Sequence, residues 1–118
     1  MTRIIGLFVL MFVGCATCSP QDVSIGNWLL TSCQLSIKSL EAEHVSDSPY
    51  EAMRDGYCTG LVQGIADTSP HVCPGEHVTN GQTIRVVLKY LQDHPEVLNR
   101  KSSRLAEEAL SKAFPCRR

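Results

Sequence analysis

Hydrophobic residues recur at three- or four-residue intervals along most of the chain, and this spacing is that of one face of an α-helix. The first such stretch covers residues 23–43, with a stripe of Ile25, Leu29, Cys33, Ile37 and Leu40. A second stretch covers residues 50–67, with Met53, Tyr57, Leu61 and Ile65 on one face. The pattern therefore predicts two amphipathic helices in the first half of the chain.

Turn and capping residues place two more helices after a proline-rich loop. Residues 68–78, "TSPHVCPGEHV", hold two prolines and a glycine and cannot continue a helix. Thr79 caps the third helix, and Gln82 three residues later completes a capping box. Pro95 suits the first turn of a fourth helix, whose stripe is Leu98, Ser102, Leu105, Ala109, Ala113 and Cys116. The predicted fold class is all-α, a small disulfide-bonded bundle of about four helices.

Residues 1–18 have the features of a signal peptide. Arg3 precedes an apolar run, "IIGLFVLMFV", and small residues follow in "GCATCS". The run is too short to span a bilayer, which takes about 20 apolar residues. We predict export to the periplasm and a single domain over residues 19–118. The alternative is a lipoprotein in which Cys15 carries the lipid.

The exported part of the chain keeps four cysteines, Cys33, Cys58, Cys73 and Cys116. An even number in a short exported chain indicates two disulfides, for which three connectivities exist. The first and last of these cysteines lie on core stripes, and the other two flank the end of the second helix. We therefore predict the pairs Cys33–Cys116 and Cys58–Cys73.

The candidate chemistry of the chain is limited. Cys58 with His71, Cys73 and His77 offers zinc-type ligands, but their spacing matches no common motif and exported thiols oxidise. There is no G-x-S-x-G elbow, and the cysteines are committed to disulfides. We predict no metal, no cofactor and no enzymatic activity.

Charge is distributed unevenly along the chain. Residues 19–99 contain 4 basic and 10 acidic residues, whereas residues 100–118 contain 6 basic and 2 acidic ones. No stretch combines enough basic and aromatic residues to bind nucleic acid. We expect the basic end to be a solvated helix face with favourable charge at a helix C-terminus.

Three glycines, Gly56, Gly60 and Gly64, recur every four residues inside the second predicted helix. Each costs about 1 kcal/mol relative to alanine in a helix interior. Their spacing puts them on one face, where another helix backbone can approach closely. We predict close helix packing within the bundle, and the alternative is a groove that receives a partner protein.

Five segments of the chain closely resemble, in the same order, the Rap/Tai-type immunity proteins of bacterial type VI secretion. They are "GNWLLTSC" (26–33), "GYCTGLVQGIAD" (56–67), "CPGEHVTNGQ" (73–82), "YLQDHPE" (90–96) and "AFPC" (113–116). The spaced cysteines, "HPE" and "AFPC" are the most specific part. The resemblance implies a periplasmic, all-helical protein that binds and neutralises a peptidoglycan-cleaving amidase effector.

An immunity protein needs an exposed, rigid polar feature to cover an enzyme cleft, because ordering a floppy loop on binding costs affinity. Residues 68–78 meet this need, and we predict that the amidase is contacted by His71, Glu76, His77 and Asn80. In the alternative, the loop is only a connector and a helix face binds.

Two other functions remain open, an acid-stress chaperone and a lipid-binding helical bundle. The sequence also leaves a homodimer open.

Overall fold

The structure, a computed structural model, describes residues 22–42 and 47–117. Its helices are α1 (Gly26–Ala42), α2 (Pro49–Thr68), α3 (Asn80–Asp93) and α4 (Ser102–Ala113), with a short 3₁₀ helix η2 (Pro95–Val97) between the last two. In the described ranges, β-pairing is limited to two isolated bridges. The prediction of an all-α fold with four helices is confirmed. The predicted signal peptide, residues 1–18, lies outside the described residues, and so does Cys15.

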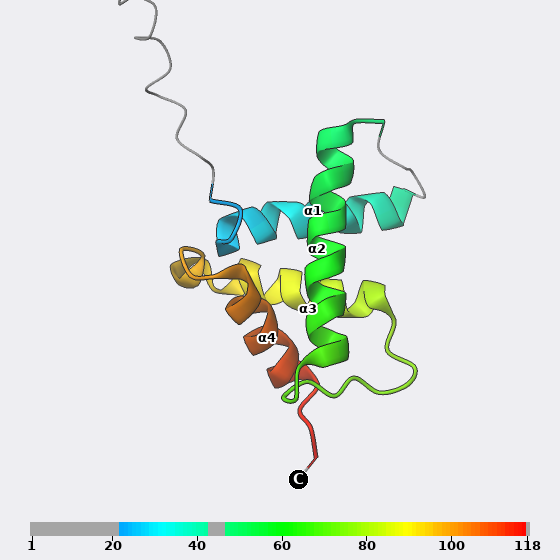
Figure 1. The fold of residues 1–118 in the computed structure, drawn as a ribbon, viewed down its shortest axis with the longest axis vertical. Helices are drawn as coiled ribbons and strands as arrows, with labels where there is room; N and C mark the ends of the chain where they lie inside the picture. Colours follow the sequence, from blue (N-terminus) through cyan, green and yellow to red (C-terminus); the bar gives the residue numbers. More distant parts are fainter. Residues whose placement is uncertain (1–21, 43–46, 118) are drawn as a thin grey trace, which may run out of the picture.

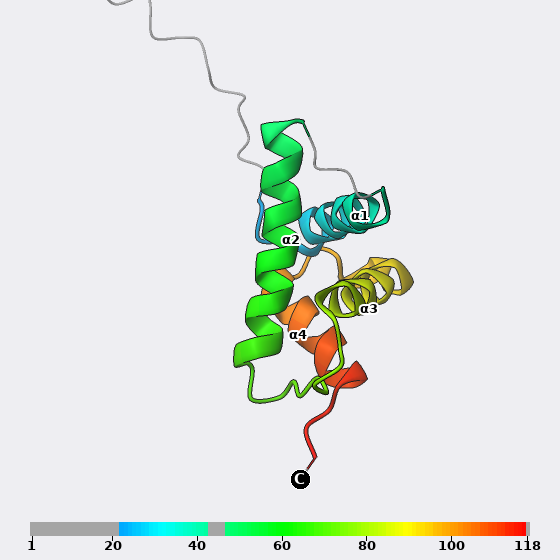
Figure 2. The same cartoon turned by 90° about the vertical axis from the view of Figure 1, so that its right-hand side faces the viewer.

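α2 crosses the other helices and joins them into one core. In Figure 1, α1 and α3 lie side by side and α2 runs across both, with α4 packed below; Figure 2 shows α1 and α3 nearly end-on against α2. The hydrophobic side chains that are at most 1% exposed come from all four helices: Leu29, Cys33, Cys58, Val62, Ile84, Val87, Leu91, Leu105, Ala106 and Leu110. Within the described part of the chain, no helix is both long and apolar enough to cross a membrane.

The segment before α4 caps the start of α1. The backbone N–H groups of Gly26 and Asn27 donate to the carbonyls of Arg100 and Leu98, at 2.9 and 3.0 Å. The first turn of a helix has N–H groups without partners inside the helix, and these contacts satisfy two of them. The predicted fourth helix starting at Pro95 is therefore wrong in its first half: η2 ends at Val97, residues 98–100 form a turn and a bend beside the start of α1, and the extended Lys101 precedes Ser102, which begins α4.

Gly26 is the glycine at which helices pack closely. An added Cβ would lie 2.5 Å from Leu105 Cδ1 and 3.0 Å from the carbonyl oxygen of Leu98. Just before α1, Asp22 accepts hydrogen bonds from the hydroxyl and the N–H of Ser24, and these bonds hold the pKa of Asp22 below its usual value.

The buried face of α2 differs from the predicted one. Cys58 and Val62 are fully buried, whereas Met53 is 54% exposed. The other three residues of the predicted stripe are partly buried, so they border the core rather than form its centre. The cause is the crossing with α1, which directs Cys58 inward.

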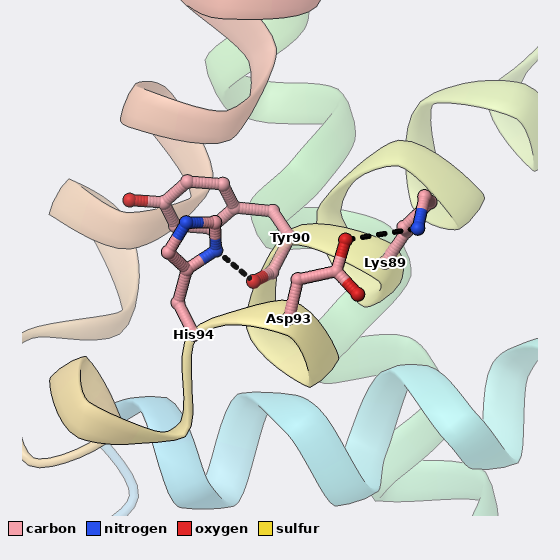
Figure 3. A network of polar contacts seen from close by, with 4 residues as sticks. All are labelled: Lys89, Tyr90, Asp93 and His94. Atoms are coloured by element: carbon pink, nitrogen blue, oxygen red, sulfur yellow. Dashed lines mark hydrogen bonds and ion pairs between the residues drawn. The ribbon is translucent and has the colours of Figure 1, made fainter.

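The capping box of α3 is confirmed, since Gln82 N–H donates to Thr79 Oγ1 and the Gln82 side chain accepts from Thr79 N–H. At the other end, the rings of Tyr90 and His94 stack with centroids 4.4 Å apart, and His94 Nδ1 donates to the Tyr90 carbonyl at 2.8 Å (Figure 3). The Lys112 ammonium of α4 lies 5.0 Å from the centroid of the Tyr90 ring. The "DHP" segment thus ends α3 and joins it to α4.

The predicted disulfide pairing is wrong, although all four cysteines form disulfides. The pairs are Cys33–Cys58, with Cα atoms 5.2 Å apart, and Cys73–Cys116, with Cα atoms 4.9 Å apart. Cys58 lies ten residues before the end of α2, about 15 Å along the helix from the start of the loop that carries Cys73. It instead faces Cys33 where α1 and α2 cross.

Candidate functional site

The first half of the loop between α2 and α3, which covers residues 69–79, is attached to the segment that follows α4. Cys73 is bonded to Cys116, and its N–H donates to the Phe114 carbonyl at 2.9 Å. Val72, only 4% exposed, pairs with Pro115 in an antiparallel bridge. Covalent, backbone and packing contacts therefore hold the loop in one position relative to α4. The loop and the C-terminal segment lie at the bottom of Figure 1.

Ser69 adds a polar link between this loop and α4. Its hydroxyl donates to Glu107 Oε1 at 2.6 Å and accepts the N–H of His71 at 3.2 Å. The same residue also ends α2, because its N–H donates to the Ile65 carbonyl at 2.9 Å. Ser69 thus sets the position of His71 beside α4.

The predicted contact residues all lie at the surface of the loop region but do not form one cluster. His71, Glu76 and His77 are exposed, and Asn80 is partly buried at the first position of α3. His71 and Asn80 line two different hollows, and neither hollow includes Glu76 or His77. The loop therefore presents polar groups over a broad face rather than at a single point.

The hollow beside His71 has a volume of about 300 Å³ and is charged. It is lined by His71, Arg100, Arg104, Glu107, Glu108 and Ser111. Arg100 lies 3.2 Å from Glu108 Oε2, and Glu107 accepts the Ser69 hydroxyl. We call this hollow the α4 pocket.

The second hollow, of about 240 Å³, lies between α2 and the later half of the loop. It is lined by Gln63, Ala66, Asp67, Pro74, Gly75, Val78, Asn80 and Thr83. Asn80 is held there because its carbonyl accepts the Thr83 hydroxyl at 2.7 Å. On the loop side of this hollow, the chain makes a turn in which Val78 N–H donates to the Gly75 carbonyl at 3.0 Å.

The predicted packing role of the α2 glycines is wrong. An added Cβ at Gly56, Gly60 or Gly64 would meet no atom within 4 Å, and all three glycines are exposed. They lie on the side of α2 opposite Cys58 and Val62, so none of the described helices packs against them. Their helix-propensity cost is not offset by any contact in the described part of the chain.

The zinc-type residues are not brought together. Cys58 and Cys73 belong to different disulfides, and no group of three or more metal-ligating side chains occurs among the described residues.

Sequence reasoning missed the α4 residues of the charged pocket. The basic end was interpreted only as a solvated helix face, but Arg100, Arg104, Glu107 and Glu108 share one face of the chain. Their three- and four-residue spacing was visible as a polar stripe opposite the apolar one. What the sequence did not show is that the loop comes to lie beside that stripe.

A second missed cluster joins α1 to α2. The Arg54 guanidinium lies 4.2 Å from the centroid of the Trp28 ring and donates to Ser32 Oγ at 3.3 Å. It also contacts Thr31, and the Tyr50 ring meets Trp28 edge-on at 6.3 Å. These contacts join α1 and α2, the same two helices that the Cys33–Cys58 disulfide joins.

Comparison with protein families identifies the family to which the chain belongs. The model of the Rap1a immunity proteins matches residues 25–116. The chain belongs to the Rap1a immunity protein family. The matched range includes the four helices, both disulfides and the α4 pocket.

Membership of the Rap1a family makes the chain an immunity protein directed against a secreted effector. The two disulfides fit an oxidising compartment, where exported proteins keep their thiols paired. No curated protein and no solved structure shows significant similarity to the chain.

Proposed function

We propose that this Rap1a-family chain is exported through its signal peptide, residues 1–18, to the periplasm. There it binds and neutralises a peptidoglycan amidase effector of type VI secretion. It acts by binding and not by catalysis. We place the surface that binds the amidase on the loop of residues 69–79, because this loop has a fixed position. The Cys73–Cys116 disulfide and the Val72–Pro115 bridge attach it to the C-terminal segment.

A fixed loop suits inhibition because it loses little conformational freedom when the effector binds. His71, Glu76 and His77 are exposed on this loop and available for polar contacts, and Asn80 follows at the start of α3. We assign these four residues to the contact with the amidase. A homodimer remains a prediction, which sedimentation velocity of the oxidised chain tests.

The first experiment measures inhibition. The chain, purified from a bacterial periplasm with its disulfides formed, is titrated into a panel of purified type VI peptidoglycan amidases that digest isolated cell walls. We expect stoichiometric inhibition of one amidase. If every amidase in the panel keeps full activity while the chain captures many unfolded proteins only at acid pH, the chaperone alternative is correct instead.

The second experiment tests the surface. His71, Glu76 and His77 are replaced together by alanine, and the matched control replaces three exposed polar residues of α1 and α3, namely Gln34, Lys38 and Gln92. Both variants should unfold at the same urea concentration as the wild type. We expect only the loop variant to lose inhibition, and unchanged inhibition by it would place the contact on another face.

A further inference from the structure

The α4 pocket contains an arginine without a partner in the described part of the chain. Arg104 makes no ion pair or hydrogen bond there, although Glu107 and Glu108 follow it by three and four residues on the same helix face. Such spacing usually brings opposite charges together. Here both carboxylates are directed elsewhere, Glu107 toward the Ser69 hydroxyl and Glu108 toward Arg100.

These two contacts leave the Arg104 guanidinium available. Glu107 is held at 2.6 Å by a hydroxyl on the fixed loop. Glu108 Oε2 is buried and lies 3.2 Å from Arg100, without a well-directed hydrogen bond from any described residue. In this arrangement neither carboxylate pairs with Arg104. Arg104 therefore offers its donors to a group from outside the molecule.

The charges near the pocket indicate whether the group that binds Arg104 is negative or positive. Two guanidinium groups and two carboxylates line the pocket itself. The segment that supplies most of these residues, described over 100–117, holds 5 basic and 2 acidic residues. This excess of basic side chains on the segment favours an anion as the group that binds there.

The planar fork of an arginine matches a carboxylate, to which it can donate two parallel hydrogen bonds. His71, whose backbone is fixed by Ser69, lies on the loop side of the same pocket and supplies a further ring nitrogen. We infer that the α4 pocket receives a carboxylate side chain, Asp or Glu, from the effector protein, with Arg104 as its main partner. This inference rests on the proposed function, because that function supplies the protein partner.

The primary test is an affinity comparison with the amidase that the wild-type chain inhibits. When a partner covers the pocket, the pair becomes buried, and removing one member of a buried charged pair costs about 2–5 kcal/mol. We expect Arg104→Glu to weaken binding at least about 30-fold, mainly through faster dissociation. Lys38→Glu on α1 makes the same charge change at an exposed site outside the pocket and should bind as the wild type does.

Two further variants separate charge from geometry. Arg104→Lys keeps the charge but lacks the fork, so it should bind with intermediate affinity. An effector variant in which the contacting Asp or Glu is replaced by Arg should bind the Arg104→Glu variant again. The same effector variant should not bind the wild-type chain. Equal affinities of the wild type, Arg104→Glu and Lys38→Glu would overturn the inference while leaving the proposed function intact.

If the wild type binds no amidase of the panel, the proposed function fails, and the pocket is then tested alone by NMR. The probes are N-acetyl-glutamate amide, with its side-chain carboxylate free, and the isosteric N-acetyl-glutamine amide. We expect the Arg104 Nε–H signal to shift with the glutamate probe only, and the shifts of neighbouring signals to disappear in Arg104→Gln. Identical shifts with the two probes would reject a carboxylate site.

Discussion

Cys33–Cys58 joins two helices inside the core, whereas Cys73–Cys116 joins a loop to the C-terminal segment near the surface. Both sulfurs of the first pair belong to residues that are 0% exposed, while Cys73 is exposed and Cys116 is partly so. The first disulfide joins α1 to α2, the two helices that Arg54 also joins through Trp28 and Ser32. The second holds the loop on which His71 lies. One disulfide therefore supports the fold, and the other supports the proposed binding surface.

The largest expected effect comes from replacing Cys33 and Cys58 together by alanine. The chain-entropy model assigns about 3.5 kcal/mol to a disulfide that closes 25 residues. The lost sulfurs also leave a cavity in the core, which adds to that cost. We expect the free energy of unfolding to fall by at least about 3.5 kcal/mol, measured by urea denaturation. A loss below about 1 kcal/mol would show that the helix crossing does not depend on this bond.

Replacing Cys73 and Cys116 together by alanine should cost less, although this disulfide closes 43 residues. The entropy model gives about 4 kcal/mol, but the loop and the last residues can then detach in the folded state and regain freedom. We expect a smaller loss than for the core pair, with the urea transition still cooperative. Amide hydrogen exchange checks the cause, because protection should fall at position 73 and at Phe114 and persist in α1. Lost protection in α1 would contradict the division of roles.

The same contrast between core and surface applies to two glycines. Gly26→Ala should destabilise the chain by about 1–3 kcal/mol, because the new methyl group would overlap Leu105 and the Leu98 carbonyl. Gly60→Ala meets no atom within 4 Å and should stabilise the chain by up to about 1 kcal/mol through helix propensity. Thermal unfolding of the two variants side by side measures both signs. A destabilising Gly60→Ala would show that the α2 face is in contact with something in the free protein.

Local features of the fold could be predicted from the sequence, and features that depend on helix crossings could not. The Thr79–Gln82 capping box needs only residues three apart, so the sequence alone identified it. The disulfide pairing depends on where α1 and α2 cross, which hydrophobic spacing does not specify. The three α2 glycines and Gly26 illustrate the same limit, because only the packed structure shows which glycine faces a neighbour.

The candidate site follows this division. The proline-rich loop and its exposed polar residues could be identified from the sequence because Pro70 and Pro74 prevent a helix there. Arg104 could not, because its significance comes from two carboxylates that are directed toward Ser69 and Arg100. The contact between the loop and α4 joins residues far apart in the sequence, among them Ser69 with Glu107 and Cys73 with Cys116.

The central claim is that the Cys73–Cys116 disulfide holds the neutralising surface in place. The most direct test measures how well a variant with both cysteines replaced by alanine inhibits the cognate amidase. Its far-UV circular dichroism should match that of the wild type, since the disulfide lies outside the helices. We expect its inhibition constant to rise at least about tenfold, because the loop must be ordered at the moment of binding. Full inhibition at the wild-type concentration, with the disulfide absent, would contradict the account.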